Sequence, residues 1–398
     1  MSQQRRLGDL VKLTSGKSPS SFRFAADGIP YFKVDQLGKS SKYLTNSDTP
    51  YFAKESPTVP TGSVLIAKRG AAIALDRVRI IRQSSFMDTN VMALTPTDEL
   101  DGEYLFYWLA KRGLWDIADV TSVPQINNKH INPLQITLPP LREQRKVVNH
   151  LSDVDSLIDA LERLISKKRA IKQGLMQELL TGRTRLSGFT KPWKNISIAR
   201  HSHLKARIGW QGLTTGEYLQ SGSYKLIGGT DFRNARIDWE SASFVSKWRF
   251  DQDRNIQLRV NDVLITKDGT IGKVAIVDSL PFPATLNSGV FVVRPIQGAY
   301  ESRFLYWLLR SSVFENFIAS LSAGSTINHL YQKDLITLTL AFPEDASEQR
   351  EISSVLDDAE SEIRVLEARL ETARNIKQGM MQELLTGRTR LPVEEVSS

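Results

Sequence analysis

KQGLMQELLTGRTRL, at Lys172–Leu186, returns almost unchanged as KQGMMQELLTGRTRL at Lys377–Leu391. The two segments differ at a single position, and they lie 205 residues apart in a chain of 398 residues. Glu143–Arg145, with the sequence EQR, also returns at Glu348–Arg350 with the same spacing. Because self-similarity at a fixed spacing indicates a repeated architecture, the sequence predicts two related units, each followed by the same kind of helix.

Apolar residues follow each EQR segment at alternating steps of four and three. They are Val147, Leu151, Val154, Ile158, Leu161 and Ile165 in the first segment, and Ile352, Leu356, Ala359, Ile363, Leu366 and Leu370 in the second. This spacing is the a/d seam of a coiled coil. It predicts helices at about 142–180 and 347–385, each roughly 60 Å long at about 1.5 Å per residue. A seam can also serve a homodimer, but two matched seams in one chain favour antiparallel pairing with each other.

The segments that precede the two helices read as related, mainly β domains. In the first, short apolar runs bounded by glycine and proline predict strands; they lie at 29–34, 63–67, 78–81, 91–95 and 135–138. A helix is predicted from Tyr104 onward. The second segment repeats this order at a spacing of about 199, which places Trp108 opposite Trp307. Both tryptophans lie in apolar helices, so we expect them in the core.

These patterns together predict an α+β fold. It consists of two pseudo-repeated mixed α/β domains, separated by two long helices that pair as an antiparallel coiled coil. The first domain spans residues 1–140 and the central helix spans 141–186. The second domain spans 187–345, and the last helix with its tail spans 346–398.

Positive charge is spread over most of the chain. The net charge is +8, with +4 in each of the segments 1–140, 141–186 and 187–345 and −4 in 346–398. A basic protein is a candidate for nucleic-acid binding, because lysine and arginine neutralise phosphates. The opposite charges of the two helical segments also favour their pairing.

The composition argues against membrane, disulfide and metal chemistry. No run of 18 apolar residues is present, and the first residues lack the apolar core of a signal peptide. The chain has no cysteine, which excludes disulfides and thiolate metal sites and suits a cytoplasmic protein. Its five histidines lack metal-ligand spacing, so we interpret them as surface residues.

Three segments resemble catalytic or phosphate-binding motifs but do not satisfy them. Gly16–Ser18 matches the end of a P-loop, yet Val11 stands where the first glycine is required. Gly269–Lys273 also has the wrong spacing. Asn132–Gln135 resembles only in part the Asn-Pro-Pro-aromatic motif of adenine methyltransferases, and no glycine-rich cofactor loop accompanies it. We therefore expect no catalytic residue in this chain.

Basic, aromatic and amide side chains suited to DNA lie near the ends of the predicted strands. We predict DNA contacts at Lys17, Lys68, Arg69, Arg77, Arg79, Gln125, Asn127, Lys205, Arg207, Trp210, Lys267 and Asn328. Lys68-Arg69 and Lys267 follow matched strands just before a glycine, so we expect them at the same turn in both domains. The simpler interpretation of each lysine or arginine is a solvated surface charge.

The order of these features resembles the specificity subunit of type I restriction–modification enzymes. The resemblance rests on two variable domains, each followed by a heptad helix that begins with EQR and ends near QELLTG. The first domain also opens in the family's manner at Leu7–Leu10, Ser15–Pro19 and Ile29–Tyr31, and Pro139–Gln144 is the family's usual entry to the central helix. In the second unit Phe342–Ser347 replaces the double proline, so we expect that junction to bend differently.

The resemblance implies a division of labour between subunits. Each domain would be a target recognition domain that reads one half of a split, asymmetric DNA sequence. The paired helices would set the half-site spacing and dock two methyltransferase subunits, and restriction subunits would join through the complex. S-adenosylmethionine would belong to the methyltransferase, and ATP and magnesium to the restriction subunit. This chain would hold no cofactor and no metal.

Two sets of helix residues are candidates for partner binding. The EQR residues, namely Glu143, Gln144, Arg145, Glu348, Gln349 and Arg350, either cap and solvate the helix starts or contact a partner protein. An apolar rim beyond the seam, at Ile171, Leu175, Leu179 and Leu180, also favours association.

Other functions use the same features. A regulatory or chromosome-organising DNA-binding protein could combine two such domains with a coiled-coil spacer. The specificity subunit of a fused methyltransferase–nuclease system would look similar. A stand-alone methyltransferase is disfavoured, because both its cofactor loop and its base-holding motif are missing.

Overall fold

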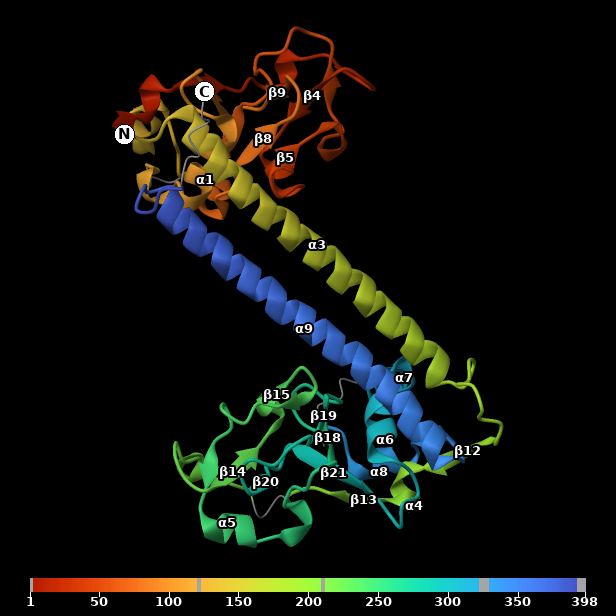
Figure 1. Cartoon of the computed structure of the whole chain (residues 1–398). Helices are drawn as coiled ribbons and strands as arrows, with labels where there is room; N and C mark the ends of the chain where they lie inside the picture. Colours follow the sequence, from red (N-terminus) through yellow and green to blue (C-terminus); the bar gives the residue numbers. More distant parts are fainter. Residues whose placement is uncertain (1–2, 120–122, 209–211, 322–328, 392–398) are drawn as a thin grey trace, which may run out of the picture. The chain divides into compact units, whose positions relative to one another are not determined.

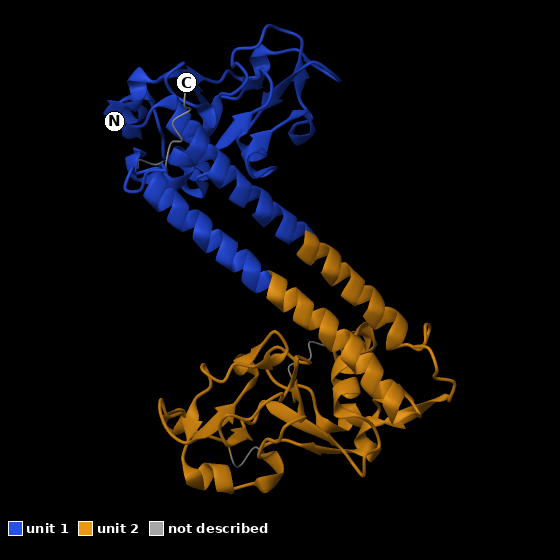
Figure 2. Ribbon diagram, in the orientation of Figure 1, with its two compact units in different colours: residues 1–163, 367–398 blue, residues 164–366 orange. Residues whose placement is uncertain are grey.

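The chain folds into two compact units, and each combines a globular part with sections of both long helices (Figure 1, Figure 2). The computed structural model describes residues 3–119, 123–208, 212–321 and 329–391. Unit 1 comprises residues 1–163 and 367–398, and unit 2 comprises residues 164–366. Each long helix therefore begins in one unit and ends in the other.

The globular part of unit 1 is built on a five-stranded sheet in the order β2-β10-β7-β8-β5. Its strands are β2 (Val11–Ser15), β5 (Tyr43–Leu44), β7 (Val64–Ala67), β8 (Arg79–Ile81) and β10 (Val91–Pro96). All neighbours are antiparallel except β5 and β8. Helix α1 (Gly102–Arg112) buries Tyr104–Leu109 in the core that it shares with this sheet. Strand β7 is buried along its whole length, which explains its unbroken apolar sequence.

Smaller elements complete unit 1. A four-stranded sheet has the order β3-β6-β4-β9, with β3 (Phe24–Ala25), β4 (Ile29–Phe32), β6 (Phe52–Ala53) and β9 (Phe86–Met87). Strand β1 (Gln3–Arg6) pairs with β11 (Gln135–Leu138), which follows helix α2 (Asn128–Ile131). Tyr31 and Phe86 form a second, small core at the four-stranded sheet.

Unit 2 repeats this plan with additions. Its main sheet has the order β13-β21-β18-β19-β16-β15, with β13 (Ser202–Lys205), β15 (Phe232–Arg233), β16 (Arg236–Ile237), β18 (Val263–Thr266), β19 (Val274–Ile276) and β21 (Val290–Pro295). A three-stranded sheet contains β14 (Tyr224–Ile227), β17 (Phe244–Val245) and β20 (Ala284–Leu286), and β12 (Trp193–Ser197) pairs with β22 (Thr339–Pro343). The short helices are α4 (Ile198–His201), α5 (Lys247–Asp251), α6 (Ser302–Leu309), α7 (Ser312–Leu321) and α8 (Gln332–Ile336).

The internal repeat is confirmed, because β2-β10-β7-β8 corresponds in order to β13-β21-β18-β19. Helices α1 and α6, which follow these strands in units 1 and 2, correspond at a spacing one residue larger than the predicted 199. The side-chain oxygen of Gln144 accepts a hydrogen bond from the backbone N–H of Asp101, and that of Gln349 accepts one from Glu301. Asp101 and Glu301 directly precede α1 and α6 and lie 200 residues apart. Trp307 therefore corresponds to Tyr107, and the predicted match with Trp108 is wrong.

The long helices are α3 (Leu141–Leu179) and α9 (Ala346–Leu384), within one residue of the predicted bounds. They pack together as an antiparallel pair. In unit 2 Lys172 pairs with Glu360, at 3.1 Å between Nζ and Oε2. In unit 1 Asp155 pairs with Lys377, at 2.6 Å. As residue numbers fall along α3, those of the partners rise along α9, which is the antiparallel arrangement.

Eight of the twelve predicted a/d seam residues are buried, and Val154, Ile158, Ala359 and Leu370 are half-buried. The buried ones have two kinds of neighbour. Leu161 and Ile165 on α3, and Ile363 and Leu366 on α9, are buried in the middle of the helices. The first seam residues instead belong to the globular cores: Val147 and Leu151 lie in the core of unit 1, and Ile352 and Leu356 in that of unit 2. One apolar face thus serves first as a domain anchor and then as a helix–helix seam.

The duplicated helix ends are buried as well. Leu179 and Leu180, at the end of α3, lie in the core of unit 2, and Leu384 and Leu385, at the end of α9, lie in the core of unit 1. The predicted apolar rim is therefore wrong at Leu179 and Leu180, because the chain's own domain covers both side chains. Each globular part holds the start of one long helix and the end of the other.

Replacing a docked leucine tests this arrangement. Leu180→Ala leaves a cavity in the core of unit 2 and should lower the free energy of unfolding by about 2–5 kcal/mol. Ile171→Ala, on the same helix but 46% exposed, should change it by less than about 0.5 kcal/mol. Urea unfolding followed by circular dichroism measures both. Equal effects of the two substitutions would contradict the docking.

Candidate nucleic-acid interface

In unit 1, predicted DNA-binding residues meet at the end of the main sheet where β2 and β7 finish and β10 begins. The backbone N–H of Lys17 donates to the carbonyl of Met87 at 2.9 Å. The ammonium of Lys68 donates to the hydroxyl of Ser15 at 3.0 Å, which joins the two loops. Arg69 lies directly opposite Gln125 in an antiparallel bridge. We call Lys17, Lys68, Arg69 and Gln125 the reading edge of unit 1.

Two glycines allow this edge to form. A Cβ atom on Gly16 would lie only 1.8 Å from the carbonyl oxygen of Asp88, so no side chain fits at that position. Gly70 has φ of +77°, a conformation that glycine adopts at least cost. The chain therefore turns sharply just before Lys17 and just after Arg69, and it leaves those two side chains exposed.

Unit 2 has the same turn, as predicted. The backbone N–H of Lys267 donates to the carbonyl of Gly289, and the carbonyl of Lys267 accepts from Leu330, both at 2.8 Å. Gly269 has φ of +68°. Lys205 ends the neighbouring strand β13 and is exposed. Asp268 lies opposite His329, and we call Lys205, Lys267, Asp268 and His329 the reading edge of unit 2.

Arg207 does not reach the surface. Its side chain is 1% exposed and donates to the carbonyl of Leu286 at 2.9 Å, to Gln252 at 3.1 Å and to Thr285 at 3.2 Å. Burial lowers the pKa of this guanidinium, with a further contribution from Arg249. Arg207 therefore ties the loop after β13 to the end of α5, and we no longer assign it a DNA contact.

The remaining predicted residues lie elsewhere. Arg77 lies beside Gly38, and Arg79 stands opposite Leu65 in β8, half-buried, where desolvation lowers its pKa. Asn127 precedes α2, and its N–H donates to His130. In the described residues, no hydrogen bond or ion pair joins these three side chains to those of the reading edge. Trp210 and Asn328 lie outside the described residues.

Sequence reasoning missed an exposed tryptophan near the edge of unit 2. Trp248, on α5, is 65% exposed. Its neighbour Arg249 pairs with both carboxylate oxygens of Glu217, and it also donates to Gln252, to which Arg207 is bound. The sequence Lys-Trp-Arg was the available signal, but it matches no motif.

The comparisons with known proteins match this architecture. The family model of the type I restriction modification DNA specificity domain matches residues 2–172 and 212–374. The chain belongs to this family. Each match covers most of a globular part and much of the helix that follows it, so the chain carries the specificity domain twice.

Individual relatives match this chain over nearly its whole length and over nearly their own. The specificity subunit of the type I restriction enzyme MjaVIII from Methanocaldococcus jannaschii is 23% identical, over 97% of this chain and 92% of its own. A type I S subunit from M. genitalium has a TM-score of 0.64 at 15% identity, covering 97% of this chain and 96% of its own. A chain from a study of complex assembly and conformational transition of the type I R-M system has a TM-score of 0.58 at 17% identity, covering 96% and 97%. These structures share the fold of this specificity-family chain.

The EQR segments of this family member are largely internal. Gln144, Gln349 and Glu348 are buried, whereas Arg145 and Arg350 are exposed and Glu143 is intermediate. Glu348 binds Arg185 through two hydrogen bonds of 2.9 and 2.5 Å. The three buried side chains hold the chain together, so we do not assign them to a partner.

Both buried glutamines also close the entry to their helix. The amide of Gln144 donates to the carbonyl of Pro139, and that of Gln349 donates to Pro343, both at 2.8 Å. The segment from Pro343 to Gln349 is one residue longer than the segment from Pro139 to Gln144, yet the same glutamine-to-proline hydrogen bond closes both.

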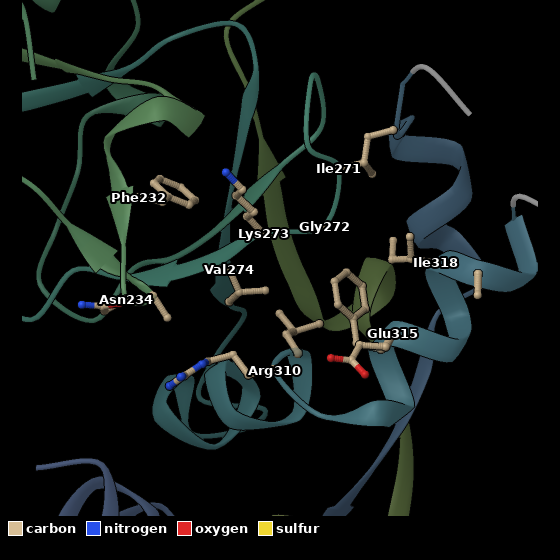
Figure 3. Close-up of a pocket in the computed structure, with 13 residues that line it drawn as sticks. Phe232, Asn234, Ile271, Gly272, Lys273, Val274, Arg310, Glu315 and Ile318 are labelled. Atoms are coloured by element: carbon tan, nitrogen blue, oxygen red, sulfur yellow. The ribbon is translucent and has the colours of Figure 1, made fainter. Parts of the chain in front are cut away.

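A cavity of about 620 Å³ lies in unit 2 (Figure 3). It lies among β15, β19, α6 and α7, and its walls are mainly apolar, with Lys273, Arg310 and Glu315 as charged members. Its lining contains no hydroxyl, thiol or imidazole, so it offers no serine-, cysteine- or histidine-type nucleophile. In the described part of the chain, no cluster of metal-ligating side chains is found, and no helix is long and apolar enough to cross a membrane.

The ion pair that holds α5 is open to direct test. Hydrogen bonds from Arg249 and from the backbone of Thr214 lower the pKa of Glu217 to about 2. Its contribution to folding is therefore present above the ordinary value near 4.5 and is lost as the pH falls from there toward 2. Arg249→Met should raise this pKa toward its ordinary value in a carboxyl-detected NMR titration.

Lys247→Met is the matched control, because Lys247 lies on the same helix but pairs with Asp251. It should leave the titration of Glu217 unchanged. An identical shift in both variants would show that the pKa reports general charge rather than the Arg249 contact.

Proposed function

We propose that this chain is the DNA-recognition subunit of a type I restriction–modification enzyme and that each globular part reads one half of a split, asymmetric target. The observation that carries the proposal is the repeated turn with different side chains: Lys68-Arg69-Gly70 in unit 1 and Lys267-Asp268-Gly269 in unit 2. One scaffold carrying two different edges is what recognition of two unlike half-sites requires. Chemistry on DNA is assigned to partner subunits, and the chain is placed in the cytoplasm with them.

The edges supply both kinds of contact that sequence-specific binding needs. Lysines such as Lys17, Lys68, Lys205 and Lys267 suit phosphates, which fix the position of a protein on DNA without reading its sequence. Arginine and amide side chains suit base edges in the major groove. Two readers on a spacer address half-sites about one helical turn apart, near 34 Å, or a multiple of it. In the proposal, the helix pair sets that separation.

The long helices also carry a surface for partner proteins. Leu157, Leu164 and Ile171 on α3 are 52%, 39% and 46% exposed. They recur every seven residues, and each lies directly before a position of the heptad seam, namely 158, 165 and 172. An apolar position beside the a/d seam widens the stripe to that of a helix in a larger bundle. This pattern supports the docking of apolar helices from methyltransferase subunits, which we take to number two. Those subunits would bring S-adenosylmethionine, and restriction subunits would bring ATP and magnesium.

A methylome tests the recognition proposal. Co-expression of this chain with the methyltransferase subunit of its system should mark adenines in one split motif, with two fixed blocks and an unspecified gap. Replacing residues 187–345 with the second domain of another specificity subunit should change one block and leave the other intact. Single-molecule sequencing of the host DNA measures both results.

Two outcomes would count against the proposal. A complex that binds DNA but modifies none of it would favour an architectural or regulatory DNA-binding protein. A domain replacement that alters both blocks would contradict separate reading of the half-sites.

A charge on the exposed stripe tests partner docking. Leu164→Glu should weaken association with the methyltransferase by about tenfold or more, because a carboxylate resists burial in an apolar interface. Ser166→Glu, at an exposed position about 200° around the helix from Leu164, introduces the same negative charge outside the stripe and should bind normally. Sedimentation of the purified mixtures measures both complexes, and equal binding by the two variants would locate the dock elsewhere.

A further inference from the structure

The two units place unlike side chains at one equivalent position on the reading edge. In unit 1, Arg69 and Gln125 are opposed in an antiparallel bridge. The backbone N–H of Ile126 donates to the carbonyl of Lys68 at 2.9 Å, and that of Gly70 donates to Pro124 at 2.8 Å. These hydrogen bonds flank the pair rather than join it, so the two side chains lie close together on one face.

Unit 2 repeats the geometry with other residues. Asp268 and His329 are opposed in the same kind of bridge, and the N–H of Leu330 donates to the carbonyl of Lys267 at 2.8 Å, as Ile126 does to Lys68. Here the side chains also meet, because Nδ1 of His329 contacts Oδ1 of Asp268. The side chains of Asp268 and His329 are 41% and 31% exposed, so a ligand can still reach them.

The flanking residues separate a shared role from a variable one. A lysine precedes the variable position and a glycine with positive φ follows it in both units. The lysine suits phosphate, which every DNA sequence offers, and the glycine permits the turn. Between them stands Arg69 in one unit and Asp268 in the other. An aspartate would repel phosphate, so phosphate binding cannot be the common role of this position.

We propose, building on the function proposed above, that these opposed pairs are specificity-determining: Arg69 and Gln125 select guanine and adenine in one half-site, and Asp268 selects an exocyclic amine in the other. Arginine pairs with O6 and N7 of guanine, and glutamine with N6 and N7 of adenine. In the described residues neither side chain is engaged in a hydrogen bond or ion pair, so both are available.

Asp268 has the complementary chemistry. A carboxylate only accepts hydrogen bonds, so it suits the N4 amine of cytosine or the N6 amine of adenine. In its contact with Asp268, Nδ1 of His329 carries the proton, because the carboxylate cannot donate. The second carboxylate oxygen remains for the base. His329 is a positioning residue, and its ring lies 4.5 Å from that of Tyr331.

Exchanging the pairs within the complete complex tests the proposal. The double variant Arg69→Asp/Gln125→His should replace guanine by cytosine or adenine, the two bases with an amine in the major groove, at the position of the methylated motif that Arg69 reads. It should also relax the preference for adenine at the position that Gln125 reads. The reciprocal variant Asp268→Arg/His329→Gln should introduce guanine at one position of the other block. Competition between oligonucleotides should show preference changes on the order of 10- to 100-fold at those positions.

Three single substitutions distinguish base reading from phosphate binding and from misfolding. Arg69→Lys retains the charge but loses the two-pronged donor, so it should relax the preference for guanine with little loss of affinity. Lys68→Ala should weaken binding to all sequences alike and reduce the salt dependence by about one phosphate contact. Arg5→Ala, in an ion pair with Glu99 beyond the far end of β10, should leave the motif unchanged.

The outcomes separate this inference from the proposed function. If the unaltered complex marks a split motif but the exchanged pairs alter affinity uniformly and change no base, the pairs contact only the backbone and the inference is overturned. If Arg69→Met, which removes every donor of this side chain, keeps the full preference for guanine, the same conclusion holds without the double variants. If the unaltered complex marks no motif, the proposed function itself fails.

Discussion

The burial of two leucines at the end of each long helix is the constraint on which the rest of the structure depends. Leu180 and Leu385 are 1% and 2% exposed, each inside a globular core. One residue more or fewer in a helix would rotate its end by about 100°, and the leucines would leave the core. Both helices have 39 residues. Their common length is therefore fixed at both ends by packing, and any spacing that they impose on DNA is fixed with it.

Each domain is joined to its long helix from an equivalent position, by different chemistry and at acceptors about one helical turn apart, because Asp357 corresponds to Ser152 and not to Asp155 in the repeat. In unit 1 the hydroxyl of Tyr107 donates to Asp155 at 2.6 Å, and the buried Lys42 binds both Tyr107 and Glu103. Burial and these carboxylates raise the pKa of Tyr107 well above its ordinary range, so the phenol stays a donor. In unit 2 the indole of Trp307, at the corresponding position, donates to Asp357 at 3.1 Å, and Arg303 binds the same carboxylate at 2.7 Å. The joint requires a hydrogen-bond donor on α1 in unit 1 and on α6 in unit 2, and the type of residue that supplies it differs.

Features encoded locally were predictable, and features created by distant contacts were not. The bounds of α3 and the burial of its seam follow from a heptad repeat that any short window displays. The local sequence did not indicate that Gln144 is buried, because its side-chain oxygen accepts a hydrogen bond from Asp101, 43 positions away, and its amide donates to the carbonyls of Glu99 and Pro139. Arg207 is buried by Leu286, 79 positions away, and β13 ends before it, so strand alternation does not place it. Trp248 belongs to no sequence motif, and only its exposure in the folded chain indicates that it is a candidate binding residue.

In the proposed interface, the residues that fold each domain are separate from the residues proposed to read DNA. At the shared turn, the lysine backbone is held by two hydrogen bonds and the glycine by its conformation. The residue between them is exposed in unit 1 (Arg69) and partly exposed in unit 2 (Asp268). Substitutions of exposed side chains usually change stability by less than about 0.5 kcal/mol. The reading position can therefore change without loss of the fold. Because the helix ends dock in the domain cores and not at the reading edges, a domain with a new edge still receives the same two helix ends.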